Sequence, residues 1–171
     1  MNTPLSRRSM LALLPSLPVA LAAGTRPAWA LTGGDAAPPF ELEGPGGPVS
    51  LAALKGRVVY LDFWASWCPP CRQSFPWMDE QLARHGASGL VVVAVNLDRQ
   101  RAAAEQFLRA VPSRATIAFD PAGDTPKRFG ARAMPSSFVI GRDGRVRLQH
   151  DGFREEDRAP LETALLQALR A

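Results

Sequence analysis

The two cysteines of this chain constrain its fold more than any other feature of the sequence. Cys68 and Cys71 are the only cysteines among 171 residues, and two prolines separate them. The apolar segment 58–64 just before them predicts a buried strand, and segment 72–84 just after them predicts a helix. The pair therefore lies where a strand turns into the N-terminus of a helix. The positive end of the helix dipole stabilises a thiolate on the first cysteine, and the thiolate is the reactive form, so redox chemistry is predicted.

Two structural interpretations of the cysteine pair fit the sequence poorly. A disulfide stabilises a fold mainly by closing a long loop, and this pair closes a very short one. A structural zinc site takes about four ligands, usually two cysteine pairs or one pair with histidines. This chain has no second pair, and His85 and His150 lie in polar contexts where we expect solvated surface side chains.

The N-terminal residues have the pattern of an export signal. Arg7 and Arg8 form a basic start, residues 10–24 are apolar, and Ala28-Trp29-Ala30 fits a cleavage site. Part of this pattern also resembles a twin-arginine signal. We therefore expect residues 1–30 to be a signal peptide and residues 31–171 to form one domain, which would be periplasmic or otherwise extracytoplasmic and soluble after cleavage. An uncleaved N-terminal membrane anchor is the alternative.

Charge and length restrict the function classes further. Residues 1–30 contain three arginines and no acidic residue, so their removal lowers the formal charge from +4 to +1. This charge does not favour nucleic-acid binding, which needs clustered basic residues. About 141 residues then remain, a usual size for a single domain with a core. Export would place the cysteine pair in an oxidising compartment, where its redox state has to be maintained actively.

The remaining sequence predicts an alternation of strands and helices. Gly/Pro-rich turns and Asp143-Gly144 predict two hairpins, and apolar segments without alternation predict central parallel strands. The expected strands are 40–42, 49–51, 57–65, 89–96, 116–119, 137–140 and 146–148, and the expected helices are 69–85, 100–110 and 157 to the C-terminus. Asp157 would be the N-cap of the last helix, whose buried stripe would consist of Leu161, Leu165 and Leu169. This order predicts an α/β fold, a mixed sheet with helices on both faces.

Several motifs resemble the thioredoxin superfamily, and within it the exported TlpA/ResA-type thiol-disulfide oxidoreductases. The similarity extends over about residues 36–170. It implies a thioredoxin-like fold in which the first hairpin is an N-terminal extension. The matching segments are 40–42, 51–56, 59–71 (which contains WCPPC), 75–76, 93–96, 134–138 (MPSSF) and 143–144.

The resemblance also implies roles for individual residues. Cys68, at the exposed start of the helix, would be the attacking cysteine, and Cys71, one turn inside the helix, would be the resolving one. Pro135 would follow a cis peptide bond and face the disulfide, and Pro76 would kink the helix. Many ResA-type members have a glutamate where this chain has Ser74.

Asp62 is the expected third catalytic residue. It resembles the buried aspartate of thioredoxins, whose accompanying lysine corresponds here to Ala94. Strand alternation places Asp62 on one face with Tyr60 and Trp64. If both faces are covered, burial raises the carboxyl pKa, and the group can accept or donate a proton at Cys71 near neutral pH.

Other residues around the pair are expected to contact the substrate. Trp67 would cover the disulfide and present an apolar rim, with Met134 and Pro135 beside the site. Pro69 and Pro70 lack backbone N–H groups, so a thiolate at Cys68 has donors only from Cys71 onward. Weaker stabilisation of the thiolate favours a reductant over a strong oxidant. We expect Trp64 and Trp77 in the core.

These expectations describe an extracytoplasmic thiol-disulfide oxidoreductase that reduces partner-protein disulfides through Cys68 and Cys71. The redox-active disulfide would be its only redox group, with no cofactor and no metal. Its partners would be disulfide-bearing client proteins and a membrane thiol donor. The sequence leaves three client classes open: cytochrome c precursors in cytochrome c maturation, proteins with a copper-site cysteine pair, and misoxidised proteins in general. No nucleic acid is expected, and the protein would be a monomer. The alternatives are an oxidant that donates its disulfide, a thiol peroxidase and a copper-handling module.

Overall fold

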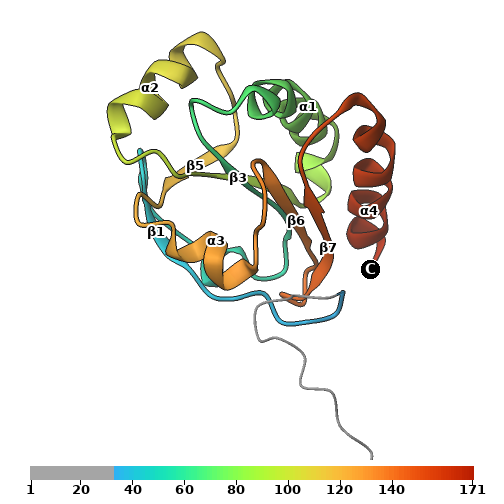
Figure 1. Cartoon of the computed structure of the whole chain (residues 1–171). Coiled ribbons are helices and arrows are strands. Elements are labelled where there is room, and N and C mark those ends of the chain that lie inside the picture. Colours follow the sequence, from blue (N-terminus) through green and yellow to red (C-terminus); the bar gives the residue numbers. More distant parts are fainter. Residues whose placement is uncertain (1–32) are drawn as a thin grey trace, which may run out of the picture.

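A computed structural model describes residues 33–171 of the chain (Figure 1). The expected signal peptide, residues 1–30, lies outside the described residues and stays a prediction. The helices are α1 Pro69–His85, α2 Arg101–Ala110, α3 Asp124–Phe129 and α4 Arg158–Arg170, with short 3-10 turns at Ala52–Leu54, Gly86–Ser88 and Glu155–Asp157. The strands are β1 Glu41–Gly44, β2 Gly47–Ser50, β3 Val58–Trp64, β4 Leu90–Asn96, β5 Thr116–Phe119, β6 Ser136–Ile140 and β7 Val146–Asp151.

The strands form one mixed sheet in the order β2-β1-β5-β4-β3-β6-β7. Strand β4 pairs in parallel with β3 on one side and β5 on the other. Strand β6 pairs antiparallel with both β3 and β7. The first hairpin, β1–β2, joins the edge of the sheet through β5. The predicted α/β class, the mixed sheet and both hairpins are confirmed.

Alternation along β3 assigns its side chains to two cores. Tyr60 and Trp64 pack on one face with side chains from α1, α2 and α4, including Phe75, Phe107 and Leu165. Leu61 and Phe63 pack on the other face, where α3 contributes Phe129 and the first hairpin region contributes Phe40. Every residue of β3 is buried. Helices therefore cover both faces, as expected, and place β3 at the centre of the molecule.

The C-terminal helix follows the expected pattern with one change. Leu161 and Leu165 are buried, but the third buried position is Ala168, because Leu169 is only half-buried. Asp157 directly precedes the helix but does not cap it through its side chain. Its carboxylate instead accepts a hydrogen bond from the backbone N–H of Arg154 at 2.7 Å. Asp157 is therefore the N-cap by position, as predicted, but its side chain stabilises the preceding turn instead of the helix.

Candidate active site

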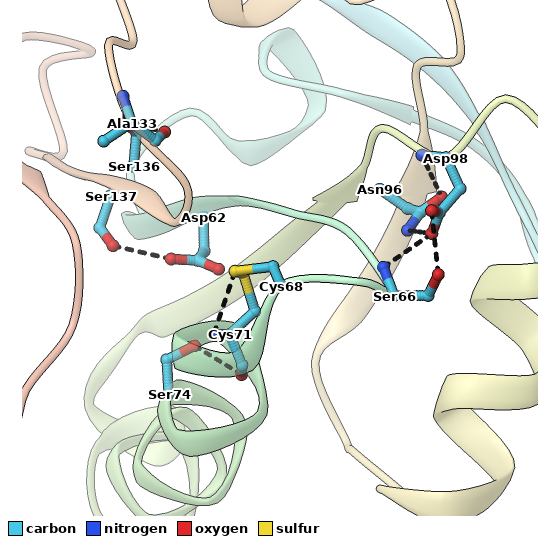
Figure 2. Close-up of a disulfide and its surroundings, with 10 residues drawn as sticks. All are labelled: Asp62, Ser66, Cys68, Cys71, Ser74, Asn96, Asp98, Ala133, Ser136 and Ser137. Atoms are coloured by element: carbon cyan, nitrogen blue, oxygen red, sulfur yellow. Dashed lines mark hydrogen bonds between the residues drawn. A yellow bond between two sulfur atoms is a disulfide. The ribbon is translucent and has the colours of Figure 1, made fainter.

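The cysteine pair lies where β3 leads into α1, at the carboxyl end of the central strand. Cys68 and Cys71 form a disulfide with Cα atoms 5.3 Å apart (Figure 2). Cys68 is the N-cap residue of α1, and its Sγ accepts a hydrogen bond from the backbone N–H of Cys71 at 3.2 Å. Pro69 and Pro70 occupy the first two helical positions and have no N–H to offer. The predicted restriction of donors to Cys71 and beyond is seen directly in this geometry.

The two sulfur-bearing side chains are more buried than we expected. Cys68 was predicted at the exposed start of the helix, yet only 3% of it is exposed, against 0% for Cys71. Burial follows from the adjacent apolar cluster, which contains both cysteines and Trp64. The order is as predicted, since Cys68 is the more accessible cysteine.

Asp62 lies in the core beside the disulfide. It is fully buried, and Oδ1 accepts a hydrogen bond from the Ser137 hydroxyl at 2.7 Å. Its other oxygen has no hydrogen-bond partner among residues 33–171. Figure 2 shows the carboxyl group between Ser137 on one side and the disulfide on the other. A carboxyl placed here can exchange a proton with a sulfur of the reduced pair.

The pKa of Asp62 reflects this burial. Loss of solvation raises the pKa from 3.8 to about 7, and the hydrogen bond from Ser137 lowers it by less. The residue opposite Asp62 on β4 is Ala94, so the strand supplies no cation there. The expected carboxyl without its usual lysine is therefore present, and it titrates near neutral pH.

A hydrogen-bond cluster that the sequence did not reveal fixes the loop before Cys68. Asp98 follows β4, and its carboxylate accepts hydrogen bonds from the Ser66 backbone N–H at 2.9 Å and the Ser66 hydroxyl at 3.0 Å. The Asn96 side-chain amide donates to the same carboxylate at 2.8 Å (Figure 2). The polar residues after strand 90–96 were the only sequence signal for this anchor.

A second loop approaches the site from β6. The Met134–Pro135 peptide bond is cis, as the resemblance implied. Because β6 runs antiparallel to β3, its first residues lie at the carboxyl end of β3, near the cysteines. Met134 packs against the apolar cluster that contains Cys68 and Cys71. Hydrogen bonds fix the loop: the Ser136 hydroxyl lies 2.6 Å from Asp151 Oδ1, and the Pro135 carbonyl accepts from the Gly152 N–H at 2.7 Å.

The tryptophans divide as predicted. Trp67, next to Cys68, is 67% exposed and is the only large hydrophobic side chain so exposed among residues 33–171. Trp64 and Trp77 are buried. Arg72 is exposed, and its guanidinium lies 5.0 Å from the centre of the Phe107 ring. The surface beside the cysteines is therefore apolar with a nearby positive charge.

Ser74 and the two histidines are the remaining polar residues that the sequence brought into question. Ser74 is buried, and its hydroxyl donates to the Cys71 carbonyl at 3.0 Å, so it holds the helix rather than titrating. The histidines are not the solvated side chains we expected. Both are half-buried, and His150 Nε2 lies 3.3 Å from Asp157 Oδ2. The strand register places His150 on the face covered by α4, which accounts for this difference.

Two searches within residues 33–171 were negative. No group of three or more His, Cys, Asp or Glu side chains there could hold a metal ion. None of the helices in this part of the chain is long and apolar enough to cross a membrane.

Comparison with known proteins places these features in a family. The sequence profile of the Redoxin family matches residues 32–165. Thiol-disulfide oxidoreductase ResA of Bacillus thuringiensis subsp. konkukian is 33% identical over 116 residues, which are 66% of this chain and 66% of the relative. The chain thus spans just under two thirds of the length of the curated relatives it matches.

Solved structures confirm the predicted thioredoxin-like fold. A candidate thiol:disulfide interchange protein DsbE from Chlorobium tepidum is 54% identical, with a TM-score of 0.81 over 82% of this chain and 99% of that one. StoA from Bacillus subtilis is 25% identical, with a TM-score of 0.63 over 75% of this chain and 96% of that one.

Proposed function

This chain belongs to the Redoxin family, as a thioredoxin-superfamily protein of the ResA/TlpA type, and we propose that it is a thiol-disulfide oxidoreductase that reduces disulfides of partner proteins. The observation that carries the proposal is the Cys68–Cys71 disulfide at the N-terminus of α1, with a buried carboxyl group behind it. Relatives named thiol-disulfide oxidoreductase ResA support the same reaction class.

The reaction takes two exchange steps. The Cys68 thiolate attacks a client disulfide, one client sulfur leaves as a thiolate, and a mixed disulfide forms. Asp62 then removes the proton from the Cys71 thiol, and the resulting thiolate attacks the Cys68 sulfur of the mixed disulfide. The Cys68–client bond breaks, and the second client sulfur leaves. The protein's dithiol has been oxidised by two electrons, and the client disulfide has been reduced.

The weak donor set at Cys68 supports the reducing direction. A low cysteine pKa stabilises the reduced form and makes a protein more oxidising, as in DsbA. Here the Cys71 N–H is the backbone donor to Cys68 Sγ, because prolines fill the first two helical positions. We therefore expect a reduction potential well below that of DsbA. A measured value near about −120 mV would favour the oxidising direction instead.

The apolar surface around the cysteines would receive the client. Trp67 is exposed beside Cys68, Pro69 is exposed at the start of α1, and Pro70 is half-buried. Met134 packs against the same cluster, and Pro135 directly precedes β6, whose first residue pairs with Phe63 near the carboxyl end of β3. These residues can bind an extended apolar segment around a disulfide without selecting one sequence.

We further propose that the protein works outside the cytoplasm and is re-reduced by a membrane thiol donor. The motivation is the signal-like pattern of residues 1–30, and an exported dithiol needs a source of electrons. Intact-mass measurement of the exported protein tests the location. A mass that begins near Leu31 supports cleavage, and a full-length chain recovered in membranes would point to an N-terminal anchor.

Trapping of the mixed disulfide tests the central proposal. Reduced Cys71→Ser protein is mixed with a disulfide-containing reporter protein. It should accumulate a complex joined by a mixed disulfide, which dithiothreitol reduces and so separates. Cys68→Ser is the matched control, because it keeps one thiol but lacks the attacking one, and it should form little complex. If Cys68→Ser forms the complex and Cys71→Ser does not, the roles are reversed. If neither variant forms it, the proposed reaction is wrong.

A further inference from the structure

Ser137 is the side chain that holds the buried carboxyl group of Asp62. Ser137 on β6 lies directly opposite Asp62 on β3, and residues paired in this way point to the same face of a sheet. The Ser137 hydroxyl donates a hydrogen bond to Asp62 Oδ1 across 2.7 Å. The two residues are 1% and 0% exposed, so bulk water does not compete for this contact. Among residues 33–171, this hydroxyl is the hydrogen-bond donor that fixes the carboxyl group.

The second oxygen of the same carboxyl group is free. Asp62 Oδ2 is buried without a hydrogen-bond partner among residues 33–171. Figure 2 shows this oxygen on the side of the disulfide and the other oxygen on the side of Ser137. Asp62 also shares its face of β3 with Tyr60 and Trp64, which pack in the same cluster as both cysteines. A buried acceptor without a partner is therefore turned toward the sulfur atoms that react.

The strands that flank Asp62 offer no cation to hold the carboxyl group in place of Ser137. Ala94 lies opposite Asp62 on β4 and is uncharged. On β3 itself, burial and the nearby Asp62 raise the pKa of Tyr60 well above its usual value, so its hydroxyl stays neutral near physiological pH. The neighbour on β6 is Ser137, whose contribution is a hydrogen bond and not a charge.

The ionisable side chains of β7 and of the turn before α4 face one another. His150 lies opposite Ser137 on β7, and its Nε2 lies 3.3 Å from Asp157 Oδ2. Helix α4 packs apolar side chains against the cluster, and α1 contributes the cysteine pair. The pKa of Asp62 accordingly responds to two influences, loss of solvation, which raises it, and the Ser137 hydrogen bond, which lowers it.

We propose that Ser137 is a positioning residue for the second exchange step. Its hydroxyl holds Oδ1 of Asp62, so that Oδ2 receives the proton of the Cys71 thiol. The inference rests on the proposed function, in which Asp62 accepts this proton. The proton leaves Cys71 Sγ for Oδ2, the Cys71 sulfur bonds to the Cys68 sulfur, and the client thiolate leaves with the electron pair of the broken bond. No further reactant is needed.

The same contact should set the pH range in which the step is fast. A hydroxyl that donates to a carboxylate stabilises the ionised form, so the Ser137 contact opposes the burial that raises the Asp62 pKa to about 7. Loss of the hydroxyl should raise this pKa by roughly one unit. Fewer Asp62 groups are then ionised, and resolution at about pH 7 should slow by roughly fivefold.

Titration of the carboxyl group in the oxidised protein tests the contact without any client. The Asp62 carboxyl carbon is followed by NMR in isotope-labelled protein, and its signal is identified by its loss in Asp62→Asn. In Ser137→Ala the titration midpoint should lie roughly one pH unit above that of wild type. Ser137→Thr and Ser137→Val have nearly the same shape, but only threonine keeps a hydroxyl. The threonine variant should keep the wild-type midpoint, and the valine variant should show the raised one.

Stopped-flow kinetics of the same variants tests whether the contact serves the reaction. The pH midpoint of mixed-disulfide resolution should rise in Ser137→Ala and Ser137→Val and stay unchanged in Ser137→Thr. Ser113→Ala is the matched control. Ser113, in the loop before β5, donates an equally short hydrogen bond of 2.7 Å to Asp79 on a later turn of α1, so its loss should move neither midpoint.

Each contrary result has a separate meaning. An Asp62 midpoint that does not move in the folded alanine and valine variants overturns the role of Ser137, and so does a shifted midpoint without a matching change in resolution. Histidine side chains also titrate near neutral pH. A resolution midpoint that moves in His150→Gln, but not in the Ser137 variants, would assign the pH dependence to His150 and overturn the inference. Wild-type protein that fails to reduce the client overturns the proposed function instead, whatever the carboxyl titration shows.

Discussion

The backbone N–H of Cys71 donates a hydrogen bond to Cys68 Sγ across 3.2 Å, from the third position of α1. A helix N-terminus usually presents several free N–H groups to a cap residue. Prolines at the first two positions remove two of them from this helix. The Cys68 thiolate of the reduced protein is therefore stabilised by few hydrogen-bond donors. The two residues between the cysteines thus help to set the reduction potential.

Replacing Pro70 by Ala should make the protein more oxidising. The variant adds one N–H near Cys68, which stabilises the thiolate and lowers the Cys68 pKa. A hydrogen bond to a charged group contributes about 1.5 kcal/mol or more. The reduction potential should therefore rise by roughly 30 mV, measured by equilibration with glutathione. Pro121→Ala, in an exposed turn away from the cysteines, should leave the potential unchanged. An unchanged potential in Pro70→Ala would show that the proline content does not set it.

The Asp98 anchor should control how well the loop before Cys68 is held. Asp98→Ala removes the acceptor of hydrogen bonds from Ser66 and Asn96, and leaves the Asn96 amide buried without that partner. We expect a loss of about 2 kcal/mol in the free energy of unfolding, and slower client reduction. Denaturant unfolding measures the first, and single-turnover kinetics the second. Asp124→Ala, which removes an exposed ion pair with Lys127, should change neither by a comparable amount.

Most of the fold could be predicted because its elements are long or carry strong turn signals. Helix α1 and strand β5 have the predicted limits, and the remaining predicted elements differ by a few residues at their ends. Helix α3, Asp124–Phe129, was not predicted. Six residues are too few to show helical periodicity, and Pro126 weakens the local signal further.

The site could be predicted where it lies within one stretch of sequence and not where it depends on strand register. Cys68, Cys71 and Asp62 fall within ten residues of one another, and alternation along β3 predicted that Asp62 shares a face with Tyr60. The contact of Ser137 with Asp62 joins residues 75 positions apart. It depends on how β6 pairs with β3, which no local pattern specifies. The same reason explains why His150 was expected in solvent.

Trp67 should contribute to client binding more than to the exchange chemistry. Trp67→Ala removes an exposed apolar side chain next to Cys68, while the core tryptophans stay in place. Large aromatic residues often dominate binding energy at protein interfaces. We expect KM for a protein disulfide to rise by roughly tenfold, an effect of about 1.4 kcal/mol. The rate with a small disulfide such as oxidised glutathione, which does not need the apolar surface, is the internal control. An equal loss with both substrates would assign Trp67 a role at the cysteines themselves.

Replacing Asp62 by Asn should stabilise the oxidised protein in a pH-dependent way. The carboxyl pKa is about 7 in the fold against 3.8 for the ordinary value, so the folded state binds the proton more tightly than the unfolded chain. The free energy of unfolding then falls as pH rises from about 4 to about 7 and levels off above that range. The amide lacks this titration and can still accept the Ser137 hydrogen bond. Asp62→Asn should therefore be more stable at about pH 8, by an amount on the order of 4 kcal/mol, and little changed near pH 4.

The same substitution should slow the second exchange step. Without a carboxylate, the Cys71 thiol has no buried acceptor for its proton, and resolution of the mixed disulfide should slow by roughly 10²-fold. The first step should change less, because Cys68 attacks as a thiolate and needs no base. Stopped-flow kinetics with a client disulfide between about pH 5 and 9 separates the two steps, and in wild type resolution should accelerate as Asp62 ionises near pH 7. A resolution rate and pH profile equal to those of wild type would assign the proton to solvent and leave Asp62 as a destabilising buried group.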